Sequence, residues 1–231
     1  MKILCSTSNK YLHIIPVFTY LFNKFWDATQ QVTILGYDLP SCELPSNFEF
    51  IQLNRGDQQT VNDYARHLRE YISNLEDEYF IYTMEDTFIK APVNFKVLSD
   101  LQALCTPEHK VGRIDLTEGM SFRPTQPYLK VNNTQVVENL QDVRFRISCQ
   151  MSIWNKEYML KYLLDGYTPW DFEVKGSELA KHDGYCILGT HQDDILAVVK
   201  NEGVTIQNIH KYNLSGFDQE TLNEMKELKL I

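Results

Sequence analysis

The 231-residue sequence has neither a cysteine framework nor a long apolar run. The scattered cysteines contain no C-x-x-C pair, which argues against a disulfide scaffold or a structural zinc ribbon. No apolar run approaches the roughly 20 residues of a membrane span, so we expect no membrane partner. The N-terminus becomes polar too early for a signal peptide, and we therefore expect a reducing, cytoplasmic location. The five cysteines are Cys5, Cys42, Cys105, Cys149 and Cys186.

The sequence also lacks an excess of basic residues. Its 22 Lys and Arg face 31 Asp and Glu, which leaves a formal net charge of −9. Such a balance disfavours broad binding to nucleic acid or anionic membranes, although a local basic patch is compatible with it. An acidic chain also suits recruitment of a divalent cation to a phosphate-bearing ligand. With 43% apolar residues the chain can build a sizeable core, and we predict one domain spanning residues 1–231.

Apolar periodicity divides the first half of the chain into alternating strands and helices. The segment 79–84 is uncharged, aromatic and β-branched, which is typical of a central strand buried on both faces. The alternation predicts an α/β fold with a mostly parallel central sheet flanked by helices. Strands are predicted at residues 2–5, 31–36, 48–53 and 79–84, and helices at about 15–25, 60–75 and 92–104.

The second half has a different, more mixed pattern. Its character changes near residue 107, and we interpret residues 1–106 and 107–231 as two halves of one domain. Leu222, Met225 and Leu228 are expected to point inward from the C-terminal helix, which Asp218 caps. Strands are predicted at 111–117, 143–153, 186–188, 195–199 and 204–206, and helices at about 155–164 and after 218.

Two adjacent carboxylates, Glu85 and Asp86, directly follow the most apolar strand. Ligands of open α/β sheets bind beyond the carboxyl ends of the strands. Adjacent carboxylates there repel each other unless a cation or hydrogen-bond donors offset them, and Mg²⁺ or Mn²⁺ prefers oxygen ligands. The sequence therefore predicts a cation bridging the protein to a diphosphate, against the alternative of a solvated strand end. A second acidic run at 191–194 is better explained as a turn than as a metal site.

Three stretches resemble glycosyltransferases of the GT-A type, particularly small bacterial and phage members. They are residues 56–59 with 65–67, residues 77–88, and residues 150–158 with 166–173. Together with the N-terminal strand and turn, the resemblance spans roughly residues 1–190. It implies a single GT-A-like, Rossmann-like domain with a UDP-sugar or similar donor at the carboxyl edge of the sheet. It also implies Mn²⁺ or Mg²⁺ as cofactor, a donor half at 1–106 and an acceptor half at 107–231.

The resemblance also implies a donor site. Ser6 and Thr7 match the turn that contacts base or ribose, and Glu85 and Asp86 match the acidic motif that holds ribose and metal. The usual Asp-any-Asp spacing is missing, so Asp86 is the best single ligand candidate. Arg66 matches a basic residue near the diphosphate, against the alternative of an exposed helix arginine. His210 matches a late metal ligand, against that of a surface histidine.

The acceptor half offers candidates for base catalysis and stacking. An inverting transfer needs a carboxylate near the acceptor hydroxyl, and Asp171 and Glu173 lie among aromatic residues that raise a carboxyl pKa. The alternative is that Asp171 caps a short helix and Glu173 lies in its solvated first turn. Trp154 and Trp170 are candidates for stacking on a sugar or base, although core packing is the commoner role of such a residue as Trp154.

These observations predict a metal-dependent glycosyltransferase that moves a sugar from a nucleoside diphosphate to an acceptor hydroxyl. The alternatives are a nucleotidyltransferase, which would need a Gly-rich loop where Ser6-Thr7-Ser8-Asn9 stands, or a non-catalytic nucleotide-sugar-binding module. A glycan, a small molecule or a hydroxymethylated base of phage DNA is open as acceptor, and a phage protein would act in the host cytoplasm. The net charge disfavours DNA. A basic patch that would offset it is predicted from Arg113, Arg123, Lys130, Arg144 and Arg146.

Overall fold

The structure is a computed structural model that describes residues 1–53, 60–191, 196, 198–200 and 214–231. The predicted strand at 204–206 lies outside the described residues, as does His210. The same holds for the stretch 56–59, which carried part of the family resemblance, and for most of the acidic run at 191–194.

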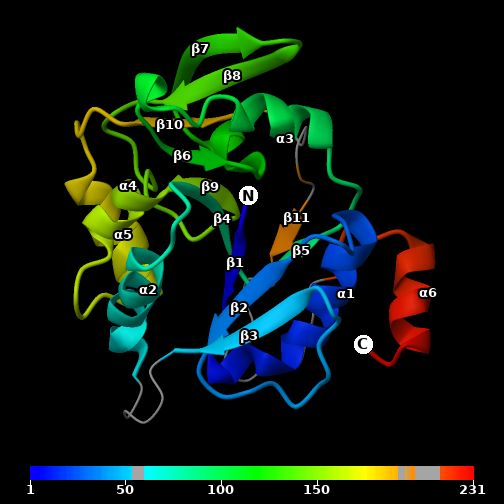
Figure 1. Ribbon diagram of the computed structural model, residues 1–231. Coiled ribbons are helices and arrows are strands. Elements are labelled where there is room, and N and C mark those ends of the chain that lie inside the picture. The colour runs from blue at the N-terminus through cyan, green and yellow to red at the C-terminus, as the bar shows by residue number, and fades with distance from the viewer. Residues whose placement is uncertain (54–59, 192–195, 197, 201–213) are drawn as a thin grey trace.

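Strands and helices alternate along the first half of the chain, as the periodicity predicts (Figure 1). The strands are β1 (Ile3–Ser6), β2 (Val32–Gly36), β3 (Phe48–Gln52), β4 (Tyr79–Met84), β5 (Thr87–Ile89), β6 (Val111–Asp115), β7 (Thr125–Val131), β8 (Thr134–Asn139), β9 (Ser152–Asn155), β10 (Cys186–Gly189) and β11 (Val198–Lys200). The helices are α1 (Ile15–Phe25), α2 (Tyr64–Ser73), α3 (Phe95–Gln102), α4 (Lys156–Tyr162), α5 (Pro169–Leu179) and α6 (Gln219–Glu227), with short 3₁₀ turns η1 (Asn9–Ile14), η2 (Val61–Asp63), η3 (Pro107–His109) and η4 (Glu118–Phe122).

One nine-stranded sheet runs through both halves of the chain, in the order β3-β2-β1-β4-β9-β6-β10-β8-β7. β1, β2, β3 and β4 form one side of it and are parallel to one another. The other side is mixed, because β9 runs antiparallel to both β4 and β6 while β10 runs parallel to β6. β5 and β11 form a separate antiparallel pair. The fold is thus α/β, with a large mixed sheet that is parallel in its first half and flanked by helices.

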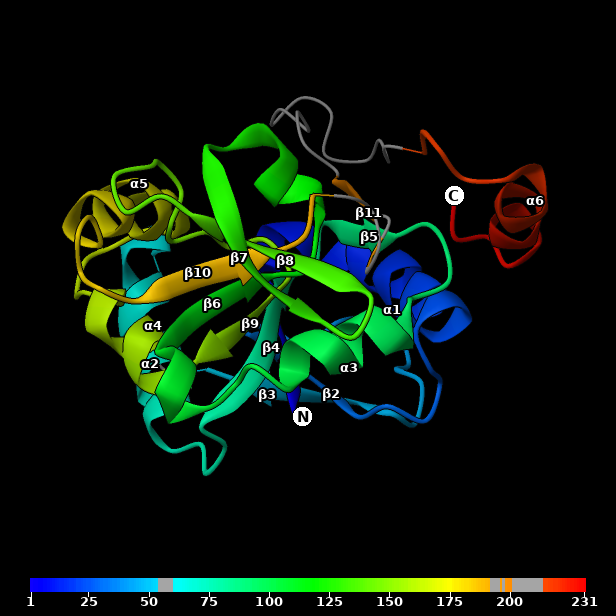
Figure 2. The same ribbon diagram turned by 90° about the horizontal axis from the view of Figure 1, so that it is seen from above.

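Helices cover both faces of this sheet, so the core has two layers. In Figures 1 and 2, α2, α4 and α5 lie on one side, and α1 and α6 lie on the other. The α1 side buries Phe18 and Phe22, and the α2 side buries Tyr82 and Trp154. Side chains of one strand alternate between these two layers, which explains why β1, β2 and the middle of β4 read as uninterrupted apolar runs.

Local sequence signals set several helix boundaries. Pro16 occupies the first turn of α1, where its missing N–H costs nothing. Thr60 and Asp63 form the predicted capping box ahead of α2, with Thr60 N donating to Asp63 Oδ2 at 2.8 Å. Asp218 caps α6 by accepting from Thr221 N at 2.7 Å. Met225 is buried as predicted, whereas the prediction for Leu228 was wrong, because its side chain is exposed.

The prediction of a long strand at 143–153 was wrong. Only residues 152–155 are extended in β9, and the preceding segment is a buried loop. Apolar residues such as Ile147 and Met151 face the core from this loop, so their hydrophobicity reports burial and not a strand. The β7–β8 hairpin was missed because its strands are rich in polar residues, although Asn132 in its turn adopts the left-handed conformation that asparagine tolerates.

Asp100 joins this hairpin to α3. Its carboxylate accepts from Asn132 Nδ2 at 2.6 Å and from Thr134 Oγ1 at 2.7 Å, and the side chain is buried. The hydrogen bonds from Thr134 and then Asn132 lower the pKa of Asp100 below its ordinary 3.8. A depressed carboxyl pKa stabilises the fold above the unfolded-state value, and this contribution is lost as the pH falls through the folded-state value.

We therefore expect Asp100→Asn to be less stable than the native chain at pH 7, with the difference shrinking as the pH falls below 3.8. Urea unfolding at several pH values measures this, with Asp165→Asn as the control because Asp165 is exposed and outside this contact. A difference that stays constant with pH would show that the charge of Asp100 has no part in holding the hairpin.

Candidate active site

The register of the sheet brings several chain segments to one edge. Ser6 of β1 is paired with Met84 of β4, so Thr7 and the pair Glu85-Asp86 lie just beyond the same carboxyl edge. β9 is antiparallel to β4, with Ser152 opposite Tyr82, so the segment before β9 also reaches this edge. The carboxyl end of β6 joins it through Asp115, which is paired with Ser152.

Glu85 is buried in the turn between β4 and β5. Its backbone N–H donates to Ser6 O at 3.3 Å, and its Oε2 has no hydrogen-bond partner among the described residues. Burial raises the pKa of this carboxyl well above its ordinary value, and the neighbouring Asp86 carboxylate adds to the rise. Hydrogen bonds from the Thr7 side chain and the Ser8 backbone oppose it. A carboxyl in this state favours the protonated form, which can itself donate a hydrogen bond.

Asp86 is half-buried beside Glu85 and is the more accessible of the two carboxylates. Tyr11 of η1 lies within electrostatic range of both carboxylates. Burial raises the pKa of Tyr11, and the charges of Glu85 and Asp86 raise it further. Ser6, Thr7, Glu85 and Asp86, all predicted donor residues, therefore meet at one place with Tyr11 beside them. Tyr11 was missed because a 3₁₀ turn has no distinct apolar period.

Arg66 lies on the first turns of α2, beyond the carboxyl end of β2. Its guanidinium pairs with Asp63 at 2.8 Å and with Glu70 at 3.7 Å. The hydrogen bond from Arg66, followed by those from Thr60, lowers the pKa of Asp63 to about 2. Arg66 is half-exposed, and both it and Asp63 influence the pKa of Tyr37, the residue that follows β2. The side chain is thus near the sheet edge but already paired.

The two candidate bases have different surroundings. Asp171 completes a second capping box, in which its Oδ2 accepts from Thr168 Oγ1 at 2.9 Å, and it pairs with Lys175 at 2.8 Å. The hydrogen bond from Lys175, then those from Thr168, lower its pKa, so Asp171 is a weak base that caps α5. Glu173 instead points toward the loop before β9.

Glu173 is fixed through one oxygen. Its Oε1 accepts from Cys149 N at 2.7 Å and from Ser148 Oγ at 2.9 Å, while Oε2 accepts no hydrogen bond within the described part of the chain. Hydrogen bonds on one oxygen orient a carboxylate and leave the second oxygen available. This arrangement is the one that a positioned general base requires.

A buried polar chain connects Glu173 with the donor side. Tyr82 OH lies 2.7 Å from Tyr64 OH, and Tyr64 OH lies 3.6 Å from Cys149 Sγ. Tyr82 also hydrogen bonds to the Ser6 side chain. The chain from Ser6 through two tyrosines to Cys149 crosses from β1 to the loop that holds Glu173, so the two predicted halves of the site adjoin.

The two candidate tryptophans differ in their exposure to solvent. Trp154 is completely buried and packs against Tyr158 and Phe172, with ring centroids 6.1 and 5.8 Å away. It has no exposed ring face, so we assign it to the core and not to acceptor stacking. Trp170 is 66% exposed in the first turn of α5 and can stack on a ligand.

A buried network around Asp115 also borders this edge, and we did not predict it. Asp115 Oδ1 accepts from Thr117 Oγ1 at 2.7 Å, and Oδ2 accepts from Arg113 at 3.4 Å and Arg123 at 3.3 Å. Thr117 Oγ1 also lies 3.0 Å from Gln150 Oε1. The same strand-end rule that singles out Glu85 would have found Asp115, had the end of β6 been placed at residue 115.

The predicted basic patch is not a continuous surface. Arg113 and Arg146 are completely buried, and Arg146 pairs with Asp183 at 3.1 Å while hydrogen bonding to three backbone carbonyls. Lys130 is exposed on β7, near the turn of the hairpin. Only Arg123 and Arg144 remain at the sheet edge, because the fold uses the other two arginines to satisfy interior carbonyls and carboxylates.

The carboxylates of Glu85 and Asp86 fit a cation that is also bound by oxygen atoms of a ligand. In the described ranges no group of three or more His, Cys, Asp and Glu is placed to hold a metal. Asp86 offers one accessible carboxylate, and Glu85 next to it has an unpartnered oxygen but is buried. Mg²⁺ and Mn²⁺ commonly take one or two carboxylates together with phosphate oxygens, so these residues suit that mode and not an all-protein cage.

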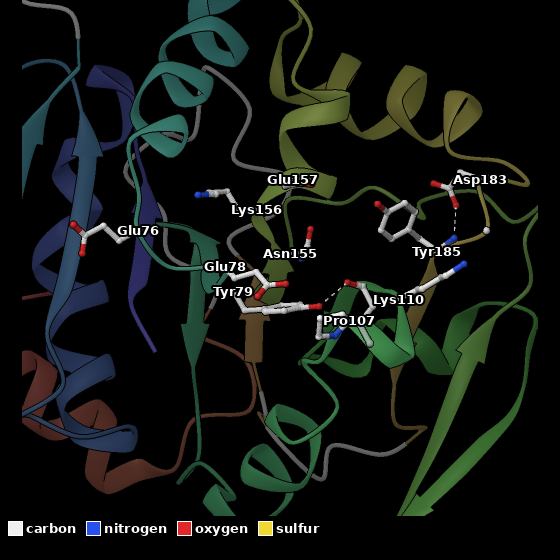
Figure 3. A pocket seen from close by; sticks show the side chains of 12 residues that line it. Glu76, Glu78, Tyr79, Pro107, Lys110, Asn155, Lys156, Glu157, Asp183 and Tyr185 are labelled. Carbon is white, nitrogen blue, oxygen red and sulfur yellow. Dashed lines mark hydrogen bonds between the residues drawn. The ribbon is translucent and has the colours of Figure 1, made fainter.

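A pocket of about 530 Å³ lies at the opposite, amino edge of the sheet, where Tyr79 begins β4 and Val111 begins β6 (Figure 3). Tyr185 and Asp183 line its far side, and Lys110 and Lys156 carry its positive charges. None of the predicted site residues lines it. We place the active site at the carboxyl edge, where the strand ends converge, in preference to this pocket.

No described helix has the length and apolarity needed to cross a bilayer. No protein-family model matches the chain, and no curated protein matches it.

Structures similar to this chain include glycosyltransferases of the GT-A type. S. aureus TarS, residues 1–349, is 16% identical over 85% of this chain and 60% of that fragment, with a TM-score of 0.47. The mannosyltransferase PcManGT from Pyrobaculum calidifontis, in complex with GDP-Man and Mn²⁺, is 14% identical over 87% of this chain and 57% of that protein, with a TM-score of 0.48. A CMP:2-keto-3-deoxy-manno-octonic acid synthetase with CTP is 11% identical over 81% and 88% of the two chains, with a TM-score of 0.43.

The chain thus spans less than two thirds of the first two of these proteins. At such identities and TM-scores, the likeness to glycosyltransferases is one of fold alone.

Proposed function

We propose that this protein is a nucleotide-sugar-dependent glycosyltransferase whose reaction takes place at the carboxyl edge of the sheet. The observation that carries this proposal is the polar chain from Ser6 through Tyr82 and Tyr64 to Cys149. It joins the Glu85-Asp86 turn, suited to a diphosphate, to the Glu173 carboxylate, suited to an acceptor hydroxyl. A site with both functions side by side is what sugar transfer requires.

On the donor side, the side chains of Ser6, Thr7 and Glu85 offer hydrogen-bonding groups to a ribose or base. Asp86 would be the protein ligand of a divalent cation, Mn²⁺ or Mg²⁺, held jointly with the diphosphate. Such a cation, when bound, neutralises the negative charge that develops on the leaving nucleoside diphosphate. Arg66 can add a positive charge if it exchanges one of its present partners, Asp63 or Glu70, for a phosphate.

On the acceptor side, Glu173 is the general base and Trp170 is a stacking surface. The acceptor oxygen attacks the anomeric carbon, the bond from that carbon to the diphosphate oxygen breaks, and the acceptor proton passes to Glu173 Oε2. A single displacement of this kind inverts the configuration at the anomeric carbon. The product's anomeric coupling constants, measured by NMR, test this part of the proposal, because retention would exclude Glu173 from the role of a single-displacement base.

Asp86→Asn tests the donor side. With Mn²⁺ and a panel of nucleotide sugars, the native protein should hydrolyse or transfer at least one donor, and the variant should lose about 100-fold or more in kcat/KM, since a neutral amide no longer balances the cation. Calorimetry with UDP and Mn²⁺ reports binding independently of turnover. Asp38→Asn is a matched control, because Asp38 is exposed and hydrogen bonds to Asn9 on the surface.

Three results would contradict the proposal. Absence of binding for every nucleotide sugar would remove its basis. Binding without turnover across a broad acceptor library would favour a non-catalytic binding module. Transfer of a nucleotidyl group from CTP or UTP, in place of a sugar, would favour a nucleotidyltransferase.

A further inference from the structure

An aromatic and cationic rim lies on the loop before β9, which contacts Glu173, and at the end of η4. We call it the acceptor rim and define it as Phe122, Arg123, Arg144 and Phe145. Phe122 is 76% exposed, Phe145 is 38% exposed and Arg144 is exposed, whereas the Arg123 side chain is 10% exposed. The guanidinium carbons of Arg123 and Arg144 lie 5.9 and 5.8 Å from the centre of the Phe145 ring. These three residues therefore form one cluster, and Phe122 directly precedes Arg123 in the chain.

The backbone of Phe145 is strained in a way that displays its ring. Its φ is +58°, in the left-handed region that a bulky residue rarely adopts. The conformation is held by the fully buried Arg113, whose Nη2 donates to Phe145 O at 3.4 Å. Strain of this kind persists only where the surroundings over-determine it, and it gathers at functional sites.

The rim offers one cation that has no ion-pair partner among the described residues. Asp115 pairs with Arg113 and Arg123, and Glu173 also acts on the Arg113 guanidinium, so two carboxylates balance these two arginines. Arg144 is exposed and forms no ion pair with any described residue. Arg144 is therefore the rim cation that can meet an anion.

The loop that carries Arg144 and Phe145 also contacts Glu173 of α5. Ser148, three residues after Phe145, donates to Glu173 Oε1 at 2.9 Å, and Arg123 reaches the same network through Asp115. A molecule whose hydroxyl lies at Glu173 would therefore extend toward Phe145 and the two rim arginines.

We propose, on the basis of the proposed function, that the acceptor is an anionic saccharide, whose sugar ring stacks on Phe145 or Phe122 while its phosphate or carboxylate binds Arg144. Guanidinium groups match both anions, and sugar rings pack their C–H faces on aromatic rings.

The same cluster fits a nucleic-acid strand less well. Strand binding needs cations that follow several phosphates, together with a row of stacking rings. Here Arg113 and Arg146 are buried, and Lys130 lies near the hairpin turn, so two arginines remain. The net charge of −9 also opposes a polyanion more than a small molecule with one anionic group.

Binding of three sugars tests the proposal, by NMR or calorimetry, first without donor and then with UDP and Mn²⁺. Glucose 6-phosphate and glucuronate are the charged probes, methyl glucoside is the neutral one, and a short oligothymidylate represents nucleic acid. We expect at least one charged sugar to bind more tightly than methyl glucoside. Arg144→Ala should weaken that binding about 10-fold, the scale of one charge-assisted hydrogen bond. Lys130→Ala, which removes an exposed charge elsewhere, should leave it unchanged.

Phe145→Gly separates this role from a structural one. Glycine adopts positive φ without strain, which offsets part of the loss of the Phe145 ring, so we expect the variant to fold and yet to bind the charged sugar more weakly. The relative affinity for glucose 6-phosphate and glucuronate identifies the anion. Equal binding of neutral and charged sugars, no effect of Arg144→Ala, binding of oligothymidylate alone, or no binding at all would each overturn the proposal. Donor binding is measured separately, so any of these results leaves the glycosyltransferase assignment to its own test.

Discussion

Glu173→Gln is expected to lower kcat for donor turnover by about 10²–10⁴-fold, the usual contribution of a positioned general base. Glutamine keeps an oxygen that can accept from Cys149 N and Ser148 Oγ, so the loop before β9 should stay in place. The amide cannot take a proton from the acceptor. Affinity for UDP and Mn²⁺ should change little, because Glu173 lies on the acceptor side. Steady-state kinetics of sugar release, together with UDP calorimetry, measures both quantities.

Asp171→Asn is the matched control for this experiment, since Asp171 is an acid two residues away on the same helix. It caps α5 through Thr168 and pairs with Lys175, so its loss should reduce stability slightly and leave kcat close to native. If Asp171→Asn removes turnover and Glu173→Gln does not, the two residues exchange roles and the geometry of Glu173 has another purpose.

Asp115→Asn is expected to cost about 3–5 kcal/mol of folding stability, the usual effect of removing one partner from a buried ion pair. The asparagine amide oxygen could still accept from Thr117, but Arg113 would lose its countercharge while completely buried. For a domain whose total stability is about 5–15 kcal/mol, this is a large share. Urea unfolding followed by circular dichroism gives the difference, with the exposed Asp142→Asn as control.

The double variant Arg113→Met, Asp115→Leu shows whether charge is the cause. Replacing a buried pair by apolar residues of similar volume is often neutral, so the double variant should be more stable than Asp115→Asn alone. If Asp115→Asn stays within about 1 kcal/mol of the native chain, water or relaxation satisfies Arg113.

Sequence patterns correctly located those helices and strands that bury one face along their whole length. The uncharged run of β4, the apolar stripe of α2 and the capping residues Thr60 and Asp218 predicted structure within a few residues. The patterns failed where burial had another cause. Ile147 and Met151 are apolar because a loop packs into the core, and the polar strands of the β7–β8 hairpin carry no clear alternation.

The site residues, like the helices and strands, could be predicted only where a local pattern in the sequence indicates them. A strand-end rule reads chemistry directly from Glu85 and Asp86, because the residues that follow a buried strand must lie at its carboxyl edge. The roles of Asp171 and Glu173 could not be separated in this way, since both are acids in the N-terminal half of α5. Only the positions of Thr168 and Lys175 around one, and of Ser148 and Cys149 around the other, separate them.

The sequence by itself determined the α/β alternation, the position of the acidic pair after β4 and the acidic net charge, because these depend on local pattern and composition. Tertiary structure alone decided which charges are buried and which meet. Glu173 meets Ser148 and Cys149 because β9 inserts between β4 and β6 and brings its preceding loop to α5. Strand order depends on contacts between residues far apart in the chain, and no local pattern records them.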